Sequence, residues 1–152
     1  MEKMIKYMKE ALKEAKKAEL IDEVPIGCVI VKDDKIIARG HNQREAKQSP
    51  IGHAEIIAIN KASKKLKSWR LEGCDIYVTL EPCIMCSGAI IQSRINKVYY
   101  GASDPKGGAL GSSINVLEAN NINHRPKVVS GILKEECSSI ITNKKKKKRQ
   151  SK

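Results

Sequence analysis

Two short segments constrain this chain most strongly: His53-Ala54-Glu55 and Pro82-Cys83-Ile84-Met85-Cys86. Cys83 and Cys86 are three positions apart, so a helix that begins near Pro82 places both thiols on one face. A position at a helix N-terminus lowers the pKa of a thiol and makes its thiolate a ready metal ligand. A Cys-x-x-Cys pair alone is also compatible with a redox site or with structural zinc. The interpretation therefore depends on which other side chains reach this helix.

His53 supplies a third ligand if a second helix begins there. One His and two Cys leave a zinc ion a fourth position for water, which is typical of catalytic rather than structural zinc. Glu55 can reach such a water without binding the metal, and can take its proton and pass it on. The other two histidines have no ligand spacing to the cysteine pair. The sequence therefore predicts His53, Cys83 and Cys86 as metal ligands and Glu55 as the catalytic acid and base.

The combined pattern His-x-Glu followed by Pro-Cys-x-x-Cys is the signature of zinc-dependent nucleobase deaminases. The chain contains five cysteines, an odd number, and a cytoplasmic location is expected because no secretory signal is recognisable. A disulfide framework is not expected in that compartment. Cys28, Cys74 and Cys137 are interpreted as small buried hydrophobic residues.

Apolar periodicity predicts an α/β layered fold with a partly parallel sheet, because strands alternate with helices. Loops are expected at 41–52 and, rich in glycine, at 104–113. The predicted helices span 2–20, 53–66, 83–93 and 133–142. The predicted strands span 26–31, 35–38, 74–80, 97–100 and 127–129, the first two forming a hairpin.

The net charge of +12 favours a polyanionic partner. Residues 144–152 carry seven basic and no acidic residues, so the rest of the chain retains +5. This tail is predicted to be solvated and unstructured. No apolar run is long enough to span a membrane. Aromatic residues make up 3% of the chain and Phe is absent, which argues against a large stacking platform for single strands.

From the first helix to about Thr142 the sequence resembles the bacterial tRNA adenosine deaminases. The stretches that carry this resemblance are VPIGCVIV, GHNQRE, HAEIIAI, SWRLEGCDIYVTLEPCIMCSGAIIQSRI, YGASDPKGGALGS, NHRPKVVSGIL and EECSSII. The resemblance implies a homodimer with the three-layer α/β/α cytidine-deaminase fold and a central five-stranded mixed sheet. It implies a deaminase domain at 1–143 followed by the basic tail at 144–152.

The same resemblance implies hydrolytic conversion of adenosine to inosine at the wobble position of a tRNA anticodon, typically the ACG of an arginine tRNA. One zinc ion per subunit is implied, with zinc hydroxide attacking C6 of adenine, Glu55 shuttling protons and ammonia leaving. Asn42 is expected to hydrogen-bond the target nucleotide, and Asp104 to contact its ribose or backbone. Ile26 and Thr79 are expected to line or support the substrate pocket.

Two alternatives remain open. Deaminases of free guanine or cytidine share the zinc motif, although the charge excess and the DPKGGALGS loop favour RNA. A non-catalytic RNA-binding protein with structural zinc is the other, and Glu55 argues against it. The chain also departs from the family at Gly52, usually Ala, and at Lys144 and Lys145, where a pair of phenylalanines is common. Fraying of the last helix and weaker anticodon contacts are expected from the second change.

Overall fold

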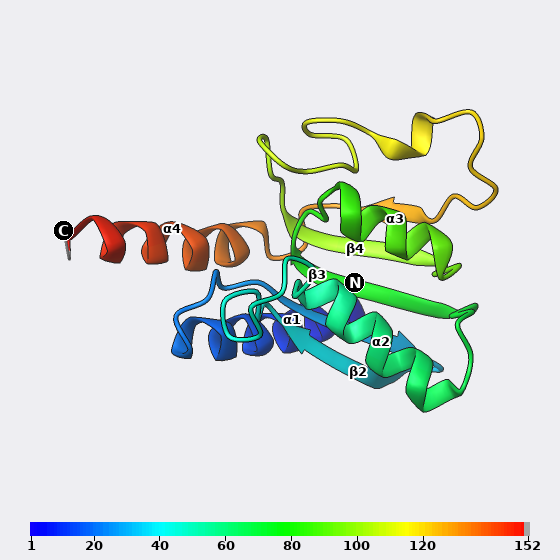
Figure 1. The fold of residues 1–152 in the computed structure, drawn as a ribbon, viewed down its shortest axis with the longest axis horizontal. Coiled ribbons are helices and arrows are strands. Elements are labelled where there is room, and N and C mark those ends of the chain that lie inside the picture. Colours follow the sequence, from blue (N-terminus) through cyan, green and yellow to red (C-terminus); the bar gives the residue numbers. More distant parts are fainter. Residues whose placement is uncertain (151–152) are drawn as a thin grey trace.

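The computed structural model describes the backbone of residues 1–150 and the side chains of residues 1–144. Helices and strands alternate along this part of the chain, which confirms the predicted α/β class (Figure 1). The helices are α1 (Glu2–Leu20), α2 (Ala54–Leu66), α3 (Ile84–Gln92) and α4 (Lys134–Gln150), with a short 3-10 helix η1 (Val116–Glu118). The strands are β1 (Gly27–Lys32), β2 (Lys35–His41), β3 (Cys74–Leu80), β4 (Lys97–Ala102) and β5 (Lys127–Val129).

The five strands form one mixed sheet, as predicted, and their order in it is β2-β1-β3-β4-β5. Strand β1 is antiparallel to both β2 and β3, whereas β3, β4 and β5 run parallel. The parallel step from β3 to β4 requires a crossover, and α3 provides it. Strand β3 leads into α3, and β4 leads into the glycine-rich loop. Because β3 and β4 are parallel, both segments leave the sheet at the carboxyl ends of the strands.

Helices cover both faces of the sheet, and each face has its own apolar cluster, because alternate strand residues point to opposite faces. The cluster on the face covered by α2 and α3 includes Cys28, Ile30, Ala54, Ala58, Ile76, Val78 and Ile90. The cluster on the face covered by α1 and α4 includes Tyr7, Met8, Val29, Val31 and Cys137. Burial on both faces explains why β1 is a continuous apolar run rather than an alternating one.

Three tyrosines meet on the face covered by α1. The rings of Tyr77 in β3 and Tyr99 in β4 stack with centroids 4.4 Å apart and planes within 6° of each other. Tyr7 of α1 tilts against Tyr77 with a centroid distance of 5.3 Å. The single tryptophan, Trp69, lies outside the core and is 58% exposed, beside the guanidinium groups of Arg70 and Arg94.

Gly27 lets α1 approach the start of β1 closely. A Cβ atom at this position would lie 2.0 Å from the carbonyl oxygen of Ala11 and 2.3 Å from the amide nitrogen of Ala15. We expect Gly27→Ala to lower the free energy of unfolding by about 1–3 kcal/mol, because backbone atoms cannot move aside cheaply. Chemical denaturation measures this. Gly88→Ala is the control, since a Cβ there meets nothing within 4 Å and Ala favours the helix; equal losses in both variants would contradict the packing argument.

The element boundaries differ from the predictions mainly at α4. This helix continues to Gln150, whereas a helix that begins over residues 133–142 and an unstructured basic tail were predicted. Lys and Arg are good helix formers, and positive charge at a helix C-terminus is favourable. The ammonium group of Lys144 forms an ion pair with Asp22, so the expected fraying does not begin there. The side chain of Lys145 and residues 151–152 lie outside the described part.

Ile90, Ile91 and Ile95, in the apolar stretch after Gly88, are buried within the single chain, so the core explains this stretch. Across the described residues, no helix has the length and hydropathy needed to cross a membrane.

Candidate metal centre and active-site cavity

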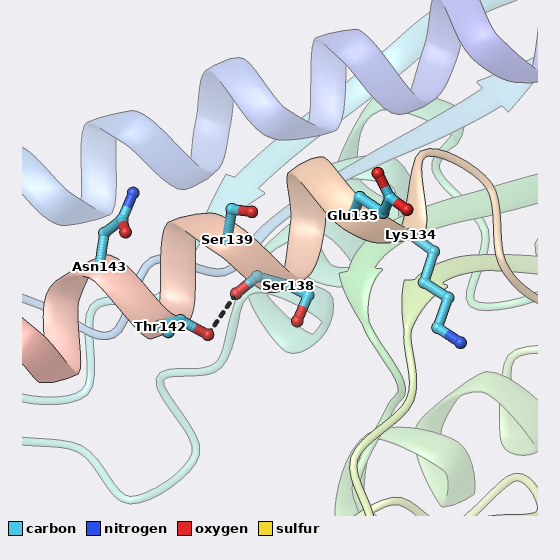
Figure 2. Close-up of a pocket in the computed structure, with 6 residues that line it drawn as sticks. All are labelled: Lys134, Glu135, Ser138, Ser139, Thr142 and Asn143. Carbon is cyan, nitrogen blue, oxygen red and sulfur yellow. Dashed lines mark hydrogen bonds between the residues drawn. The ribbon is translucent and has the colours of Figure 1, made fainter.

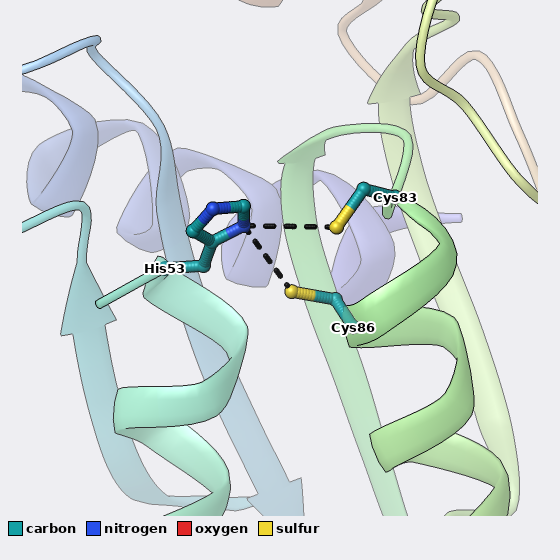
Figure 3. A group of neighbouring side chains, drawn as sticks. All are labelled: His53, Cys83 and Cys86. Atoms are coloured by element: carbon teal, nitrogen blue, oxygen red, sulfur yellow. Dashed lines mark hydrogen bonds between the residues drawn. The ribbon is translucent and has the colours of Figure 1, made fainter. Parts of the chain in front are cut away.

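The residues directly before α2 and α3 face each other at one edge of the sheet. His53 and Cys83 are the N-cap residues of these two helices, and both have extended backbones. Both helices were predicted to start at these residues, and each begins one residue later. Cys86 lies in the first turn of α3. Figure 3 shows the imidazole ring and the two sulfur atoms converging in the space between the helices.

The donor atoms have the separation that a tetrahedral zinc site requires. Nδ1 of His53 lies 3.7 Å from the sulfur of Cys83 and 3.6 Å from that of Cys86. Bond lengths of about 2.1 Å for Zn–N and about 2.3 Å for Zn–S at a tetrahedral angle place N and S about 3.6 Å apart. All three donor atoms lie within 4.8 Å of one another. The predicted ligand set is therefore assembled in a geometry that fits zinc, with three protein donors.

The two thiols differ in how readily they ionise. The Cys86 thiol hydrogen-bonds to Cys83, and this contact, helped by His53, lowers the pKa of Cys83 to about 4. The same hydrogen bond and the burial of Cys86 raise the pKa of its own thiol. The pKa of His53 is raised, first by its hydrogen bond to Cys83. Cys83 is therefore a thiolate at neutral pH, and Cys86 loses its proton only when a cation compensates the second charge.

Glu55 occupies the first turn of α2, two residues after His53, and is 4% exposed. Burial raises the pKa of its carboxyl to about 7. A carboxyl with a pKa near neutrality can both accept and donate a proton at physiological pH. Its position beside the metal-ligand group is the one predicted for the acid and base of the reaction.

A cavity of 220 Å³ opens beside this group. It brings together five residues that the sequence predicted for the site: Ile26, Asn42, His53, Glu55 and Asp104. Ile26 and Asp104 are 78 positions apart in the chain, so only the folded sheet gathers these side chains. The full lining is Val24, Ile26, Asn42, Arg44, His53, Ala54, Glu55, Leu80 and Asp104.

The chain matches the family model of the MafB19-like deaminases over residues 2–144. It is 56% identical to the tRNA-specific adenosine deaminase of Bacillus subtilis (strain 168), over 90% of this chain and 84% of that protein. The chain belongs to the tRNA-specific adenosine deaminase family. The predicted family resemblance is thereby confirmed.

Solved structures place this deaminase among enzymes of the same fold. One, from a study of A-to-I editing by tRNA:A34 deaminases at the wobble position of transfer RNA, matches with a TM-score of 0.86 and 46% identity, covering 88% of this chain and 97% of that one. The guanine deaminase of Bacillus subtilis matches less completely, with a TM-score of 0.62 and 40% identity over 64% of this chain and 63% of the other. The predicted cytidine-deaminase-like architecture is confirmed.

Thr79 of the deaminase is the one residue predicted to line or support the substrate pocket that does not line the cavity. Its side chain has no exposed surface, and its hydroxyl accepts a hydrogen bond from the amide of Gly27 at 3.1 Å. Of the two roles expected for Thr79, lining or supporting the pocket, the structure does not show the first. Its position fits the supporting role that was also expected, since the bond ties β3 to the start of β1, directly after Ile26.

Four cavity residues of the deaminase were missed by the sequence reasoning: Val24, Arg44, Ala54 and Leu80. Val24 and Leu80 are apolar residues at the ends of core segments, and nothing in the pattern distinguishes them from core positions. Arg44 lies two residues after Asn42 in the GHNQRE stretch, and its cationic side chain in a polar loop was the available signal.

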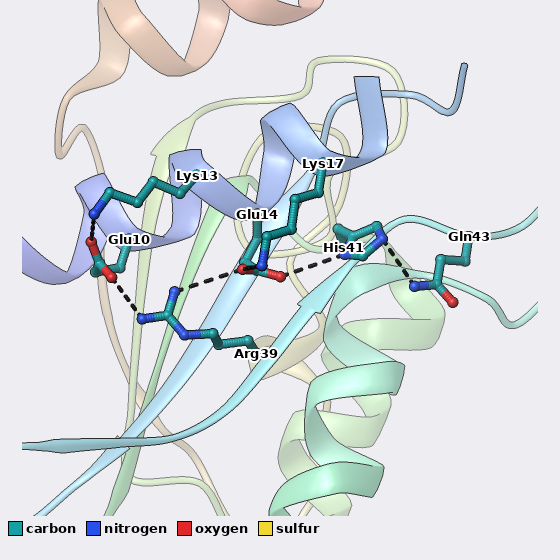
Figure 4. Close-up of polar contacts among 7 residues, drawn as sticks. All are labelled: Glu10, Lys13, Glu14, Lys17, Arg39, His41 and Gln43. Atoms are coloured by element: carbon teal, nitrogen blue, oxygen red, sulfur yellow. Dashed lines mark hydrogen bonds and ion pairs between the residues drawn. The ribbon is translucent and has the colours of Figure 1, made fainter. Parts of the chain in front are cut away.

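The segment that carries Asn42 is tied to α1 by a polar cluster beside it (Figure 4). Glu14, 3% exposed, forms ion pairs with Lys17 at 2.8 Å and with Arg39 at 3.6 Å. Its carboxylate also lies 3.4 Å from Nδ1 of His41, whose other ring nitrogen contacts Gln43 at 3.0 Å. The residues on either side of Asn42, His41 and Gln43, are therefore held by side-chain contacts, which limits the conformational freedom of the backbone at Asn42.

A larger hollow of 440 Å³ lies on α4 (Figure 2). All six lining residues come from this one helix: Lys134, Glu135, Ser138, Ser139, Thr142 and Asn143. One hydrogen bond joins two of them, from the Thr142 hydroxyl to the carbonyl of Ser138 at 3.0 Å. Since this depression contains none of the metal-ligand group and lies on a single polar helix, the smaller cavity is the candidate active site.

Proposed function

We propose that this protein is a zinc-dependent deaminase that converts adenosine to inosine at the wobble position of a tRNA anticodon. The observation that carries the proposal is the cavity that Glu55 lines together with Asn42, Asp104 and His53, the last a member of the metal-ligand group with Cys83 and Cys86. The relative from Bacillus subtilis, a tRNA-specific adenosine deaminase, supports the same substrate.

His53, Cys83 and Cys86 would hold the zinc ion, which would supply a Lewis acid that lowers the pKa of the attacking water. Glu55 accepts a proton from the attacking water and delivers it to N1 of adenine as the water oxygen bonds to C6. Glu55 then takes the remaining proton from the new C6 hydroxyl and passes it to the exocyclic nitrogen. The C6–N bond breaks to release ammonia, and the C6 oxygen becomes the carbonyl of inosine. Water and adenosine are consumed, and inosine and ammonia are formed.

Two side chains in the cavity wall are proposed to hold the nucleotide. Asn42 is 6% exposed, and its own contacts, to Val24 and Arg44, are long at 3.4 Å each. These long contacts leave its amide available to a base. One carboxylate oxygen of Asp104 accepts from the amides of Lys106 and Gly107, which leaves the other oxygen for a ribose hydroxyl. Ile26 supplies apolar surface beside them.

RNA is the proposed substrate class rather than a free base. The net charge of +12 attracts a polyanion, and an anticodon loop presents an unstacked base that can enter a cavity. An arginine tRNA with the anticodon ACG is the proposed target within that class. We also propose a homodimer and a cytoplasmic location, where tRNA is available; light scattering at micromolar concentration tests the dimer.

The experiment that tests the function is inosine formation in a synthetic anticodon stem-loop carrying ACG. Free adenosine, cytidine and guanine are assayed in parallel, and the same stem-loop carrying GCG is the matched control. Inosine in the ACG stem-loop alone supports the proposal. Turnover of a free base or nucleoside without turnover of the stem-loop overturns the proposed substrate, and zinc-loaded protein inactive on all of them supports the non-catalytic alternative.

The basic tail is expected to strengthen RNA binding in a salt-dependent way. We expect Gln substitutions to weaken binding of the stem-loop several-fold at low salt. The slope of log K against log salt should become shallower by about 0.7 for each phosphate that the tail no longer neutralises. The substituted positions are Lys145, Lys146, Lys147 and Lys148. Arg at the same positions is the control, because it keeps charge and helix propensity. An unchanged salt slope in the Gln variant would show that the tail neutralises no phosphate.

A further inference from the structure

Glu81 is a buried carboxylate at the junction between the metal-ligand segment and the rest of the site. It follows β3 directly and precedes Cys83 by two residues. Its side chain is 2% exposed. Among the side chains that the structure describes, no Lys, Arg or His forms an ion pair with it. A buried carboxylate without a cation needs hydrogen-bond donors to be stable.

The donors to this carboxylate come from one loop, residues 104–112, which contains Asp104. One carboxylate oxygen accepts from the amide of Asp104 at 3.0 Å, and the Ser112 hydroxyl donates to the same oxygen. The other oxygen accepts from the amides of Leu110 at 3.0 Å and Ser112 at 3.1 Å. The carboxylate therefore holds both ends of the loop. Hydrogen bonds to an ionised acceptor are stronger than neutral ones.

The loop is shaped to admit this carboxylate. A Cβ atom at Gly108 would lie 2.4 Å from the carboxyl carbon of Glu81 and 2.6 Å from the carbonyl oxygen of Asp104. The amide of Ala109 donates to the carbonyl of Pro82 at 2.9 Å, beside the same contact. The loop therefore packs on the two residues that precede Cys83. The glycines of this loop raise the conformational entropy that is lost when the loop is ordered, so the loop needs stabilising contacts such as these.

We propose that Glu81 is a positioning residue, which holds the loop in the shape that places Asp104 in the wall of the active-site cavity. The proposal rests on the proposed function, because it assigns Glu81 to substrate binding in that site. Glu81 does not line the cavity, so it acts through Asp104 and not on the reacting atoms. A loosened loop then weakens substrate binding and leaves the chemistry of Glu55 and the metal ligands intact. This pattern appears as a raised KM with kcat preserved.

Glu81→Gln tests the proposal, because it replaces one accepting oxygen by an NH2 group that faces amide donors. Hydrogen exchange measured on peptides covering residues 103–113 should become at least about tenfold faster, since the donors at one of the two oxygens lose their acceptor and face an NH2 group instead. KM for the ACG stem-loop should rise about tenfold, with kcat within about threefold and metal content unchanged. A fall in kcat at unchanged KM, or loss of the metal, would overturn the proposal, because Glu81 would then act on the ligand segment.

Glu23→Gln is the matched control. Glu23 is also 2% exposed and clamps the other loop of the cavity, accepting from the amides of Glu45 at 3.1 Å and Ala46 at 2.6 Å. Its loss should accelerate exchange in residues 43–52 and leave residues 103–113 unchanged. If either variant accelerates exchange equally in both loops, the effect is general destabilisation and the positioning role is refuted.

Two further variants keep the test decisive if Glu81→Gln does not fold. Ser112→Ala removes one donor and keeps the carboxylate, and should accelerate exchange of 103–113 about threefold. Gly108→Ala pushes a methyl group into the same contact, and should raise KM in the same way. No change in either variant refutes the proposal. The exchange measurement needs no substrate, so a wild-type protein inactive on RNA would overturn the proposed function separately.

Discussion

Replacing Glu55 by Gln is expected to abolish inosine formation while the protein keeps its metal. Glu55 is the buried carboxylate in the first turn of α2, beside the ligand group and within the cavity wall. Gln retains the shape of Glu but cannot carry a proton between water and the base. General acid and base catalysis contributes about 10²–10⁴-fold, and here one group performs both transfers. We therefore expect kcat to fall by at least about 10³-fold.

Single-turnover assays of the ACG stem-loop measure the loss, and elemental analysis measures the metal. Glu118→Gln is the control, since this exposed carboxylate in η1 lies outside the cavity. Stem-loop binding by the Glu55 variant should stay near the wild-type level. Turnover of the Glu55 variant within about tenfold of the wild type would remove Glu55 from the mechanism.

The second large effect is expected from Cys83→Ser. The low pKa of Cys83 makes it the thiolate that is ready at neutral pH, whereas a serine hydroxyl does not ionise there. We expect the purified variant to contain less than about a tenth of the wild-type zinc and to form no inosine, since loss of one of three protein ligands opens the site. Treatment of the wild-type protein with a strong chelator should give the same loss, and zinc should reverse it.

Cys137→Ala is the control for the loss of a thiol. Cys137 is fully buried on the opposite face of the sheet, between α4 and β4, and is no part of the ligand group. This variant should lose stability and keep its zinc. A Cys83→Ser variant with one zinc per chain and normal activity would show that the ligand assignment is incorrect.

The elements near the site could be predicted because their patterns are local. The strand 74–80 and the proline before Cys83 define where β3 ends and α3 begins, and the apolar spacing of α2 defines its start near His53. The ligand set and Glu55 follow from the motif, because zinc chemistry restricts which residue types can serve at that spacing. Asn42 and Asp104 were found through family resemblance, and the structure brings both to the cavity.

The features that the sequence did not predict depend on contacts between residues far apart in the chain, which a local sequence pattern does not indicate. The alternation of β3 leaves open which face Thr79 points to, and its burial became clear only with the bond to Gly27. In the sequence, Glu81 is a polar residue between a predicted strand and a proline, and nothing there indicates a special role. Its role depends on donors 23 to 31 residues later in the chain. The length of α4 was underestimated because lysine repeats suggest solvation, although each lysine also favours a helix.

The stacked pair Tyr77 and Tyr99 gives the protein an intrinsic optical signal for the pairing of β3 and β4, the two strands that lead to the candidate active site. The pair bridges β3, which leads to Cys83, and β4, which leads to Asp104, so its coupled ring transitions in the near-ultraviolet circular dichroism spectrum depend on that strand pairing. Trp69, largely exposed beside two arginines, dominates the fluorescence instead and reports on the surface. Spectra of a variant that lose the tyrosine band while the tryptophan emission is unchanged would identify separation of the two strands that carry the site.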